Sequence, residues 1–360
     1  MPVKPSRLAG ARWCVVLLAA ALVTVVSVAC VQVKRAGEGP PRPRSYAEVA
    51  ALIDTLRVFE ARIGYRETKN FRRLAEDRPS FPFCGNAPRL YLPYSYEDPA
   101  IKWYDVATEE QCRSLEEGTD VYFGQSEALG EIDTPVTPAM LAASLPRLIY
   151  VVLHEDCHDQ FDLPYGIEEA LCNVIGYHAL PIFAAEQYGR LRAEYYATDR
   201  YASVASAEAQ TTIRFYDEVA ALYARHAKLA TRPERVVLDE RNRIFRRAGR
   251  ALGWGDDAVN NVLLANAMTY SRHYPFIEEV FASLDNDVAR TVAFFREVEH
   301  ARPTPDEVMR RQALSSRESV DYLRAYEGAV VETARKLLAE KACARTPPGM
   351  LPVTPCAETL

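Results

Sequence analysis

The sequence lacks a strong excess of charge of either sign. Its 43 Lys and Arg residues stand against 49 Asp and Glu residues, which gives a formal net charge of −6 over 360 residues. Proteins that bind nucleic acids usually carry a clear basic excess, so this balance argues against a nucleic-acid partner. The Arg-rich segment 232–250 also contains Glu234, Asp239 and Glu240, which indicates an ion-paired helix exposed to solvent.

The sequence also lacks internal repeats, and its 49% apolar content is enough for a buried core. Residues 37–44 are rich in Pro, Gly and Arg, as expected of a tether. We therefore expect a single domain over residues 45–343. It would follow an N-terminal segment (residues 1–30) and a linker (residues 31–44), and an irregular tail (residues 344–360) would come after it.

The N-terminal segment has the pattern of an export signal. Three basic side chains lie in residues 4–12, and residues 13–29 are apolar except for Thr24 and Ser27. Small residues directly before Cys30 suit cleavage by a secretory or a lipoprotein signal peptidase. The apolar run is also long enough for an uncleaved membrane anchor. In either case we expect the domain to be exported, either periplasmic or anchored to the membrane facing away from the cytoplasm.

The cysteines agree with export, because disulfides persist in oxidising compartments. Six of the eight cysteines lie beyond residue 30. Their neighbourhood in the sequence suggests three disulfides: Cys84–Cys112, Cys157–Cys172 and Cys343–Cys356.

Histidine is scarce, with six residues in the chain, yet two of them frame the segment His-Glu-Asp-Cys-His at residues 154–158. An H-E-x-x-H pattern is expected by chance only about 0.01 times in a chain of this composition. On a helix, His154 and His158 share one face and can bind the same zinc ion. Glu155 would then lie beside the open coordination position, where it can act on water.

The third metal ligand is expected from the next helix. A turn-rich stretch, residues 159–166, is followed by Ile167-Glu168-Glu169, which opens a long helical pattern. His, His and Glu is one of the ligand sets of catalytic zinc. Glu168 and Glu169 point about 100° apart, and we prefer Glu169, because the small Cys172 lets the two helices approach. Glu168 would then be a neighbour of the ligands or a solvated side chain.

A rival interpretation makes Cys157 a metal ligand, but it lies off the helix face that carries both histidines.

The remaining pattern predicts a mainly α (α+β) fold with a small strand and loop region ahead of the motif helix. Ser45–Glu48 begins a capped helix, residues 80–124 hold loops and a few strands, including 120–123, and Thr137-Pro138 begins a short helix. The motif helix is expected over Arg147–Gln160, with Pro146 in its first turn. From Ile167 to about Glu340 the pattern is helical, with breaks expected at Pro181, Pro233, 253–255, Pro275 and 303–305.

Taken together, residues 154–158, the Glu-Glu-Ala-Leu-Cys segment and the stretch from Asn260-Asn261 through Thr269-Tyr270 to Pro275-Phe276 resemble a known family. It is the bacterial "putative zinc aminopeptidase" family, whose members are often exported and lipid-anchored. The resemblance covers roughly residues 50–300. It implies that His154, His158 and Glu169 bind zinc and that Glu155 is the catalytic acid and base.

The chain also departs from the pattern of this family. Asp159 stands where the family usually has Gln, and the Asn-Glu pair of the family is Glu168-Glu169 here. An upstream Tyr-Arg-Gly-Tyr-like element is not recognisable in residues 90–95.

We therefore predict zinc-dependent hydrolysis of a peptide substrate, with water activated by zinc and Glu155. The developing oxyanion needs a further donor. Tyr270 is the first candidate for that donor, followed by His273 and His178.

Two further roles have sequence candidates. Glu127, on an expected edge strand, could bind the free α-ammonium of an aminopeptidase substrate. Asp159 or Asp162 could orient a ligand imidazole. Two alternatives stay open: a non-catalytic exported protein that keeps the metal site, and a helical envelope protein in which the motif is accidental.

Overall fold

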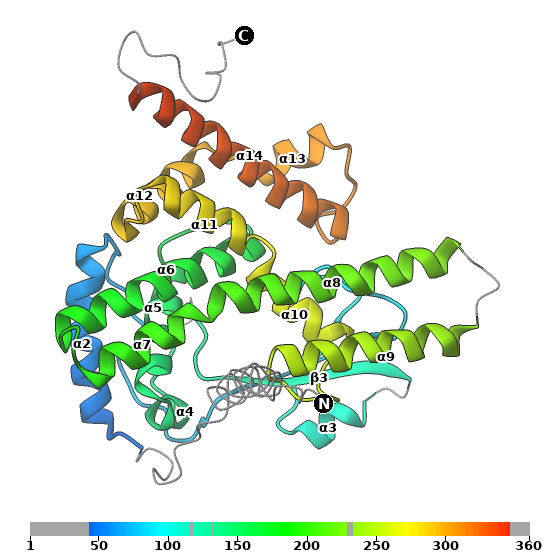
Figure 1. The fold of residues 1–360 in the computed structure, drawn as a ribbon, viewed down its shortest axis with the longest axis horizontal. Coiled ribbons are helices and arrows are strands. Elements are labelled where there is room, and N and C mark those ends of the chain that lie inside the picture. The colour runs from blue at the N-terminus through cyan, green and yellow to red at the C-terminus, as the bar shows by residue number, and fades with distance from the viewer. Residues whose placement is uncertain (1–42, 116–117, 131–132, 229–232, 346–360) are drawn as a thin grey trace, which may run out of the picture. The chain divides into compact units, whose positions relative to one another are not determined.

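The structure is a computed structural model that describes residues 43–115, 118–130, 133–228 and 233–345. These residues are mostly helical, with one small sheet ahead of the motif helix, as the sequence predicts (Figure 1). The expected export signal, nearly all of the linker, the C-terminal tail and Cys356 lie outside the described residues, so those predictions stay predictions. None of the described helices combines the length and the apolar character that crossing a bilayer requires.

The sheet has three antiparallel strands in the order β2-β1-β3. They are β1 (Phe81–Pro88), β2 (Lys102–Tyr104) and β3 (Thr119–Ser126). The predicted strand at residues 120–123 therefore lies within β3, at an edge of the sheet. The predicted Cys84–Cys112 disulfide is present and joins β1 to the short helix α3 (Glu109–Arg113).

The first helices begin where their capping residues predict. Helix α2 (Tyr46–Arg62) starts with a capping box between Ser45 and Glu48. Helix α4 (Pro138–Ala142) follows Thr137, whose side chain accepts a hydrogen bond from a backbone N–H of the first turn. The motif helix α5 (Leu145–His158) is capped by Ser144 and has Pro146 in its first turn.

Helix α6 (Tyr165–Gln187) corrects one prediction, because it continues through Pro181, where a break was expected. Proline removes one backbone hydrogen bond from a helix interior. Apolar side chains on both sides of this point, including Ile175 and Phe183, are buried in the main core. Burial of this apolar surface outweighs the missing hydrogen bond.

The other breaks lie close to the predicted positions. Pro233 caps α9, and Pro275 lies in the first turn of α11 rather than between two helices. The remaining helices are α7 (Ala193–Ser203), α8 (Ala205–Lys228), α9 (Glu234–Ala251), α10 (Asn261–Ser271), α11 (Tyr274–Ser283), α12 (Val288–Ala301), α13 (Pro305–Arg311) and α14 (Val320–Arg345).

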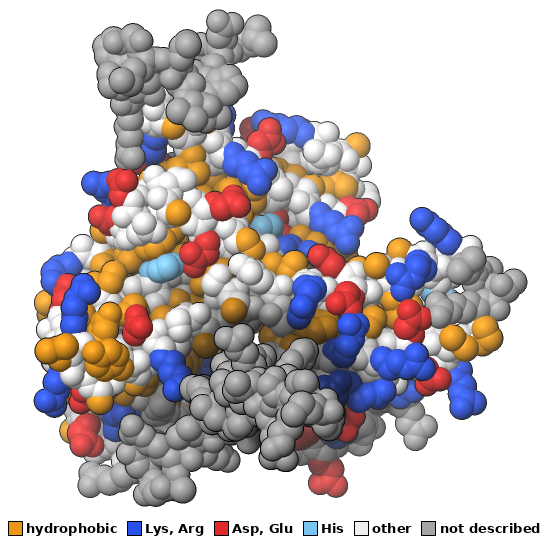
Figure 2. All heavy atoms as spheres, in the orientation of Figure 1, with side chains coloured by type: hydrophobic (Ala, Val, Ile, Leu, Met, Phe, Trp, Pro, Cys, Tyr) orange, Lys and Arg blue, Asp and Glu red, His pale blue; other side chains and the backbone are white. Residues whose placement is uncertain are grey.

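Within the described residues, the two larger hydrophobic clusters hold most of these helices, and a smaller one packs the sheet against α10. The largest one is built around α5 and α6 and includes side chains from α2, α11, α12 and α14. A second core lies between α8, α9 and α10, and Figure 1 shows α8 and α9 side by side. Ion pairs Arg225–Glu240 and Arg247–Glu218 also join α8 to α9, as expected for the Arg-rich helix. On the face shown in Figure 2, basic and acidic side chains alternate over this region.

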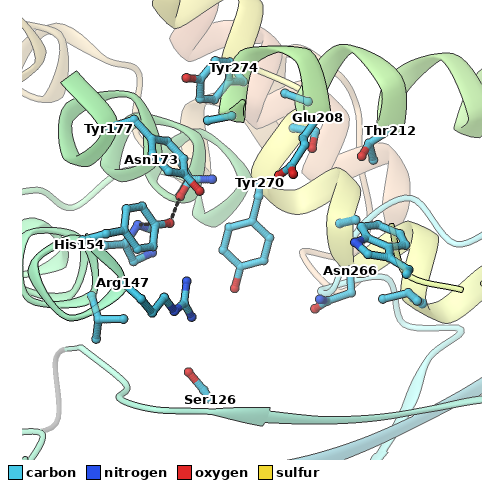
Figure 3. Close-up of a pocket in the computed structure, with 18 of the residues that line it drawn as sticks. Ser126, Arg147, His154, Asn173, Tyr177, Glu208, Thr212, Asn266, Tyr270 and Tyr274 are labelled. Atoms are coloured by element: carbon cyan, nitrogen blue, oxygen red, sulfur yellow. Dashed lines mark hydrogen bonds between the residues drawn. The ribbon is translucent and has the colours of Figure 1, made fainter. Parts of the chain in front are cut away.

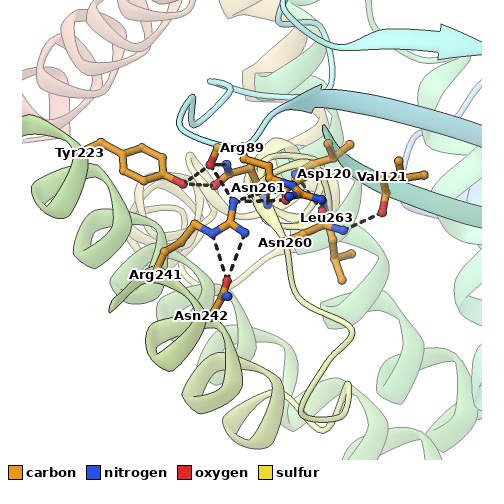
Figure 4. Close-up of polar contacts among 10 residues, drawn as sticks. Arg89, Asp120, Val121, Tyr223, Arg241, Asn242, Asn260, Asn261 and Leu263 are labelled. Atoms are coloured by element: carbon orange, nitrogen blue, oxygen red, sulfur yellow. Dashed lines mark hydrogen bonds and ion pairs between the residues drawn. The ribbon is translucent and has the colours of Figure 1, made fainter. Parts of the chain in front are cut away.

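A buried polar network ties the sheet to α9 and α10 (Figure 4). The carboxylate of Asp120 on β3 accepts hydrogen bonds from Arg241 Nη1 (2.9 Å) and from the backbone N–H of Asn261 (3.1 Å). Asn260 caps α10 and donates from Nδ2 to the carbonyl of Val121 (2.6 Å). This network fixes β3 relative to α10, the helix that carries Tyr270.

Candidate metal centre

Helices α5 and α6 bring His154, His158 and Glu169 together. His154 Nε2 lies 3.1 Å from Glu169 Oε2, and His158 Nε2 lies 3.5 Å from the same oxygen. The two Nε2 atoms are 3.3 Å apart. All three side chains are buried, and one donor atom from each lies within 4.8 Å of the others. The convergence that the sequence predicts is therefore present.

The other nitrogen of each imidazole is held by a protein group. His158 Nδ1 lies 2.8 Å from Glu168 Oε1, and His154 Nδ1 lies 3.3 Å from the hydroxyl of Tyr150, which donates to Asn173 Oδ1. These contacts hold both rings through Nδ1 and leave both Nε2 atoms facing Glu169. Metal-binding histidines are usually oriented by such contacts.

The electrostatics of the cluster suit a cation. Burial disfavours a charged imidazole, yet Glu169 and Glu168 hold the pKa of His158 well above its usual value. Burial also disfavours a charged carboxylate, but the neighbouring histidines hold the pKa of Glu169 below its usual value. The cluster thus keeps one carboxylate charged in a buried place. Two imidazoles and one carboxylate form a ligand set used by catalytic zinc, so these residues fit zinc.

Glu155 lies beside this cluster and is held by a backbone N–H. Its Oε2 accepts a hydrogen bond of 2.5 Å from the N–H of Gly130, which follows β3. A Cβ added at residue 130 would lie 2.8 Å from the carbonyl oxygen of Glu155 and 3.0 Å from His158 Cβ. Only glycine permits this close approach.

Tyr270 reaches the same site from α10. Its ring centroid lies 6.3 Å from that of His154. Burial, with the nearby carboxylates of Glu169 and Glu155, raises the pKa of Tyr270 well above its usual value. The phenol therefore keeps its proton at neutral pH and can donate a hydrogen bond.

His154, Glu155 and Tyr270 line one cavity of about 540 Å³. Figure 3 shows Tyr270 extending into it, with Ser126 below and the helix α8 above. Its walls come from β3, α5, α6, α8, α10, α11 and the connection between α9 and α10, and include Tyr122, Arg147, Tyr150, Asn173, Tyr177, Glu208, Thr212, Trp254, Asn266 and Tyr274.

Glu127, the candidate for binding the α-ammonium group of a substrate, is already paired with Arg147. Glu127 accepts hydrogen bonds from Arg147 Nε (3.0 Å) and Nη2 (2.7 Å). Burial opposes ionisation, but Arg147 holds the pKa of Glu127 below its usual value. This guanidinium neutralises the carboxylate, so Glu127 does not have the free charge that the prediction requires.

The two further candidates for the oxyanion donor, His178 and His273, also have other partners. His178 Nε2 lies 3.0 Å from Glu278, and His273 Nε2 lies 2.8 Å from Glu327. Neither histidine lines the cavity.

The prediction that Asp159 or Asp162 orients a ligand imidazole is wrong. Asp162 is 86% exposed and pairs with Arg302, and Asp159 accepts a hydrogen bond from Asn70. Glu168 and Tyr150 orient the imidazoles instead. Tyr150 stands four residues before His154, and this spacing was the available signal.

The predicted Cys157–Cys172 disulfide is present and joins α5 to α6. Both cysteines are buried, and because its sulfur is in a disulfide, Cys157 is not free to bind a metal. Cys343 is disulfide-bonded as well, although its expected partner lies outside the described residues.

Fold and site define a mostly helical protein with a buried His-His-Glu cluster at an open cavity. The family described as "Putative aminopeptidase" matches residues 102–314, more than half of the chain. The chain therefore belongs to this family. The match contains all three residues of the cluster, together with Glu155 and Tyr270. No curated protein and no solved structure matches the chain.

Proposed function

We propose that this protein is a zinc-dependent aminopeptidase that acts outside the cytoplasm. The observation that carries the proposal is the convergence of His154, His158 and Glu169, with both Nε2 atoms facing the carboxylate. Membership of an aminopeptidase family supports a peptide substrate. The buried disulfides and the export-like N-terminal sequence support a place in the periplasm or at the membrane.

His154, His158 and Glu169 would hold the zinc ion. Zinc bound there would supply Lewis acidity, which polarises a peptide carbonyl and makes water more acidic. Glu155 takes the proton from the attacking water as the new C–O bond forms. It then gives that proton to the leaving amine as the C–N bond breaks. Gly130 orients the carboxylate of Glu155 for both transfers.

Tyr270 stabilises the oxyanion in this proposal. The phenol reaches the cavity beside His154 and Glu155 and keeps its proton, so it donates a hydrogen bond to the developing negative charge.

The experiment compares the wild type with Glu155→Gln. Zinc content is measured by elemental analysis, and cleavage is measured on a peptide library with and without a chelator. We expect about one zinc ion per chain in both proteins, chelator-sensitive cleavage by the wild type, and a loss of about 10²–10⁴-fold in the variant.

Two results would decide against the proposal. If the variant cleaves at the wild-type rate, Glu155 is not the base. If the wild type binds zinc but cleaves nothing in the library, the alternative holds: a non-catalytic exported protein that keeps a metal site.

A further inference from the structure

Glu208 is the ionisable group in the cavity that the proposed mechanism does not use. The ionisable acid, base and His side chains of the wall are Arg147, His154, Glu155 and Glu208. Arg147 is neutralised by Glu127, which approaches it from outside the cavity. His154 and Glu155 belong to the centre already described. Glu208 is therefore the ionisable residue of this wall that neither the proposed centre nor an ion pair in the described residues accounts for.

Glu208 lies in the first turn of α8. Its carboxylate lines the cavity, and within the described ranges no hydrogen bond or ion pair joins it to another side chain. Glu208 is exposed, so its carboxylate is accessible to a ligand in the cavity. Partial shielding from solvent raises its pKa, and no neighbouring cation lowers it. A cationic ligand would therefore meet a carboxylate that no protein cation neutralises.

The position of Glu208 favours the end of a side chain over an α-ammonium group. The α-nitrogen of a substrate lies only about 2.5 Å from the scissile carbonyl carbon. Two tyrosine rings of the cavity wall, however, extend away from His154. The ring centroid of Tyr150 lies 5.4 Å from that of His154, and the ring centroid of Tyr177 lies 4.6 Å from that of Tyr150. The charge of Glu208 contributes to the raised pKa of Tyr177. Figure 3 shows Glu208 on the far side of Tyr270 from His154.

The wall around Glu208 suits a long cationic side chain. Tyr177 and Tyr274 contribute aromatic surface, and Thr212 of the same helix contributes a hydroxyl. Aromatic rings attract cations and pack against methylene groups. The combination of rings and one carboxylate is therefore complementary to lysine or arginine.

We propose that this cavity is the specificity pocket for a Lys or Arg side chain next to the cleaved bond, with Glu208 as its counter-charge. The inference rests on the peptidase function proposed above. Tyr177 and Tyr274 flank the aliphatic stem, and Glu208 binds the cationic end.

The test measures binding directly, so it does not depend on turnover. Calorimetry compares L-arginine amide with L-norleucine amide, which has a similar stem and the same α-ammonium but no side-chain charge. We expect arginine amide to bind wild-type protein about tenfold or more tightly. Glu208→Gln should reduce this preference to less than about threefold, whereas Asp217→Asn, an exposed carboxylate on α8 outside the cavity, should retain it.

Three results would overturn the inference. They are equal binding of the two amides to the wild type, no binding of either, and an equal loss of both in Glu208→Gln. The last result would mean that Glu208 binds the α-ammonium or supports the fold.

Hydrolysis of arginyl and leucyl peptides separates this inference from the function on which it rests. Cleavage of both peptides at equal rates, unaffected by Glu208→Gln, overturns the specificity and leaves the peptidase function standing. Binding of arginine amide that depends on Glu208, without cleavage of any peptide, supports the pocket and overturns the peptidase function.

Discussion

Glu168 and Glu169 are adjacent acidic residues with different surroundings. Glu169 faces both Nε2 atoms, whereas Glu168 lies 2.8 Å from His158 Nδ1 and accepts the backbone N–H of Leu163 (3.1 Å). Helical periodicity indicates that only one of the two faces the metal site, because neighbours on a helix point about 100° apart. The preference for Glu169 came from the small Cys172, and the sequence could not show that Glu168 is buried against the second imidazole.

This difference predicts distinct effects on zinc. Glu169→Ala removes a proposed zinc ligand, so we expect the purified protein to lack stoichiometric zinc. Glu168→Gln keeps an acceptor for His158 but removes its charge, so we expect zinc affinity to fall by about tenfold with the site still saturable. Competition with a chromophoric chelator measures both. Stoichiometric, tightly bound zinc in Glu169→Ala would contradict the ligand assignment.

Tyr270 can be tested against a second tyrosine of the same cavity. Tyr270→Phe removes the proposed oxyanion donor, so we expect kcat to fall by about 10²-fold with KM and zinc content unchanged. Tyr122→Phe, on β3, serves as the control and should retain kcat. Steady-state kinetics on one peptide are sufficient, and equal kcat values in the wild type and Tyr270→Phe would exclude the role.

The roles assigned to Glu127 and Asp162 were wrong, because contacts between residues far apart in the sequence determine what these side chains bind. Nothing in the sequence pairs Glu127 with Arg147, which lies 20 residues later on a different element. Asp162 follows the motif closely, yet its side chain is exposed and contacts Arg302 instead. Proximity in the sequence to a metal motif does not predict proximity in space once the helix has ended.

At the scale of elements, caps and breakers gave most helix boundaries correctly. The capping box at Ser45 and the Pro residues at 146 and 233 all mark helix starts. Pro181 misled because local propensity is weaker than burial on both sides of a long helix. Contacts such as the Asp120–Arg241 pair between β3 and α9 join residues 121 positions apart, and no local pattern specifies them.

Helices α2 and α5 share a buried acid pair, Glu60 and Asp156. Burial raises the pKa of Asp156 to about 6, although Thr68 and Asn70 donate hydrogen bonds to it. Burial and the nearby Asp156 raise the pKa of Glu60 well above its usual value. The folded protein thus holds a proton that the unfolded chain releases near pH 4.

Both pKa values are raised in the folded state, so the folded protein favours the protonated pair. The stabilisation from this pair is complete below about pH 4 and is lost as pH rises through about 6. Glu60→Gln removes one titrating group. Between pH 4.5 and 7 the free energy of unfolding should fall in both proteins. We expect the fall in the variant to be smaller than in the wild type, with a difference of roughly 1–3 kcal/mol. Urea unfolding in the presence of chelator measures this difference, and parallel pH profiles would show that the pair does not titrate as described.

At the scale of the molecule, the cluster lies where the main core is built. Helices α5 and α6 both pack in that core, and α10 joins the cavity to the second core and, through Asn260 and Asn261, to the sheet. A ligand that binds α5 and α6 together therefore stabilises the folded state as a whole.

Zinc removal should lower the stability of the entire domain. At zinc concentrations about a hundredfold above Kd, binding contributes about 3 kcal/mol, so we expect chelation to lower Tm by several degrees. Glu169→Ala should show no such shift. Calorimetry with and without chelator gives both values, and a wild-type Tm that chelation does not change would contradict zinc binding by the folded state.

The contact of Gly130 with the motif helix has an evolutionary consequence. A single methyl group at residue 130 would overlap the main chain of α5 at Glu155, so every single-nucleotide missense change in this codon adds atoms where there is no space. Natural variants that keep this loop on the helix should therefore keep glycine here. Loss of that glycine in a related gene would mark a protein whose loop has moved away from the centre.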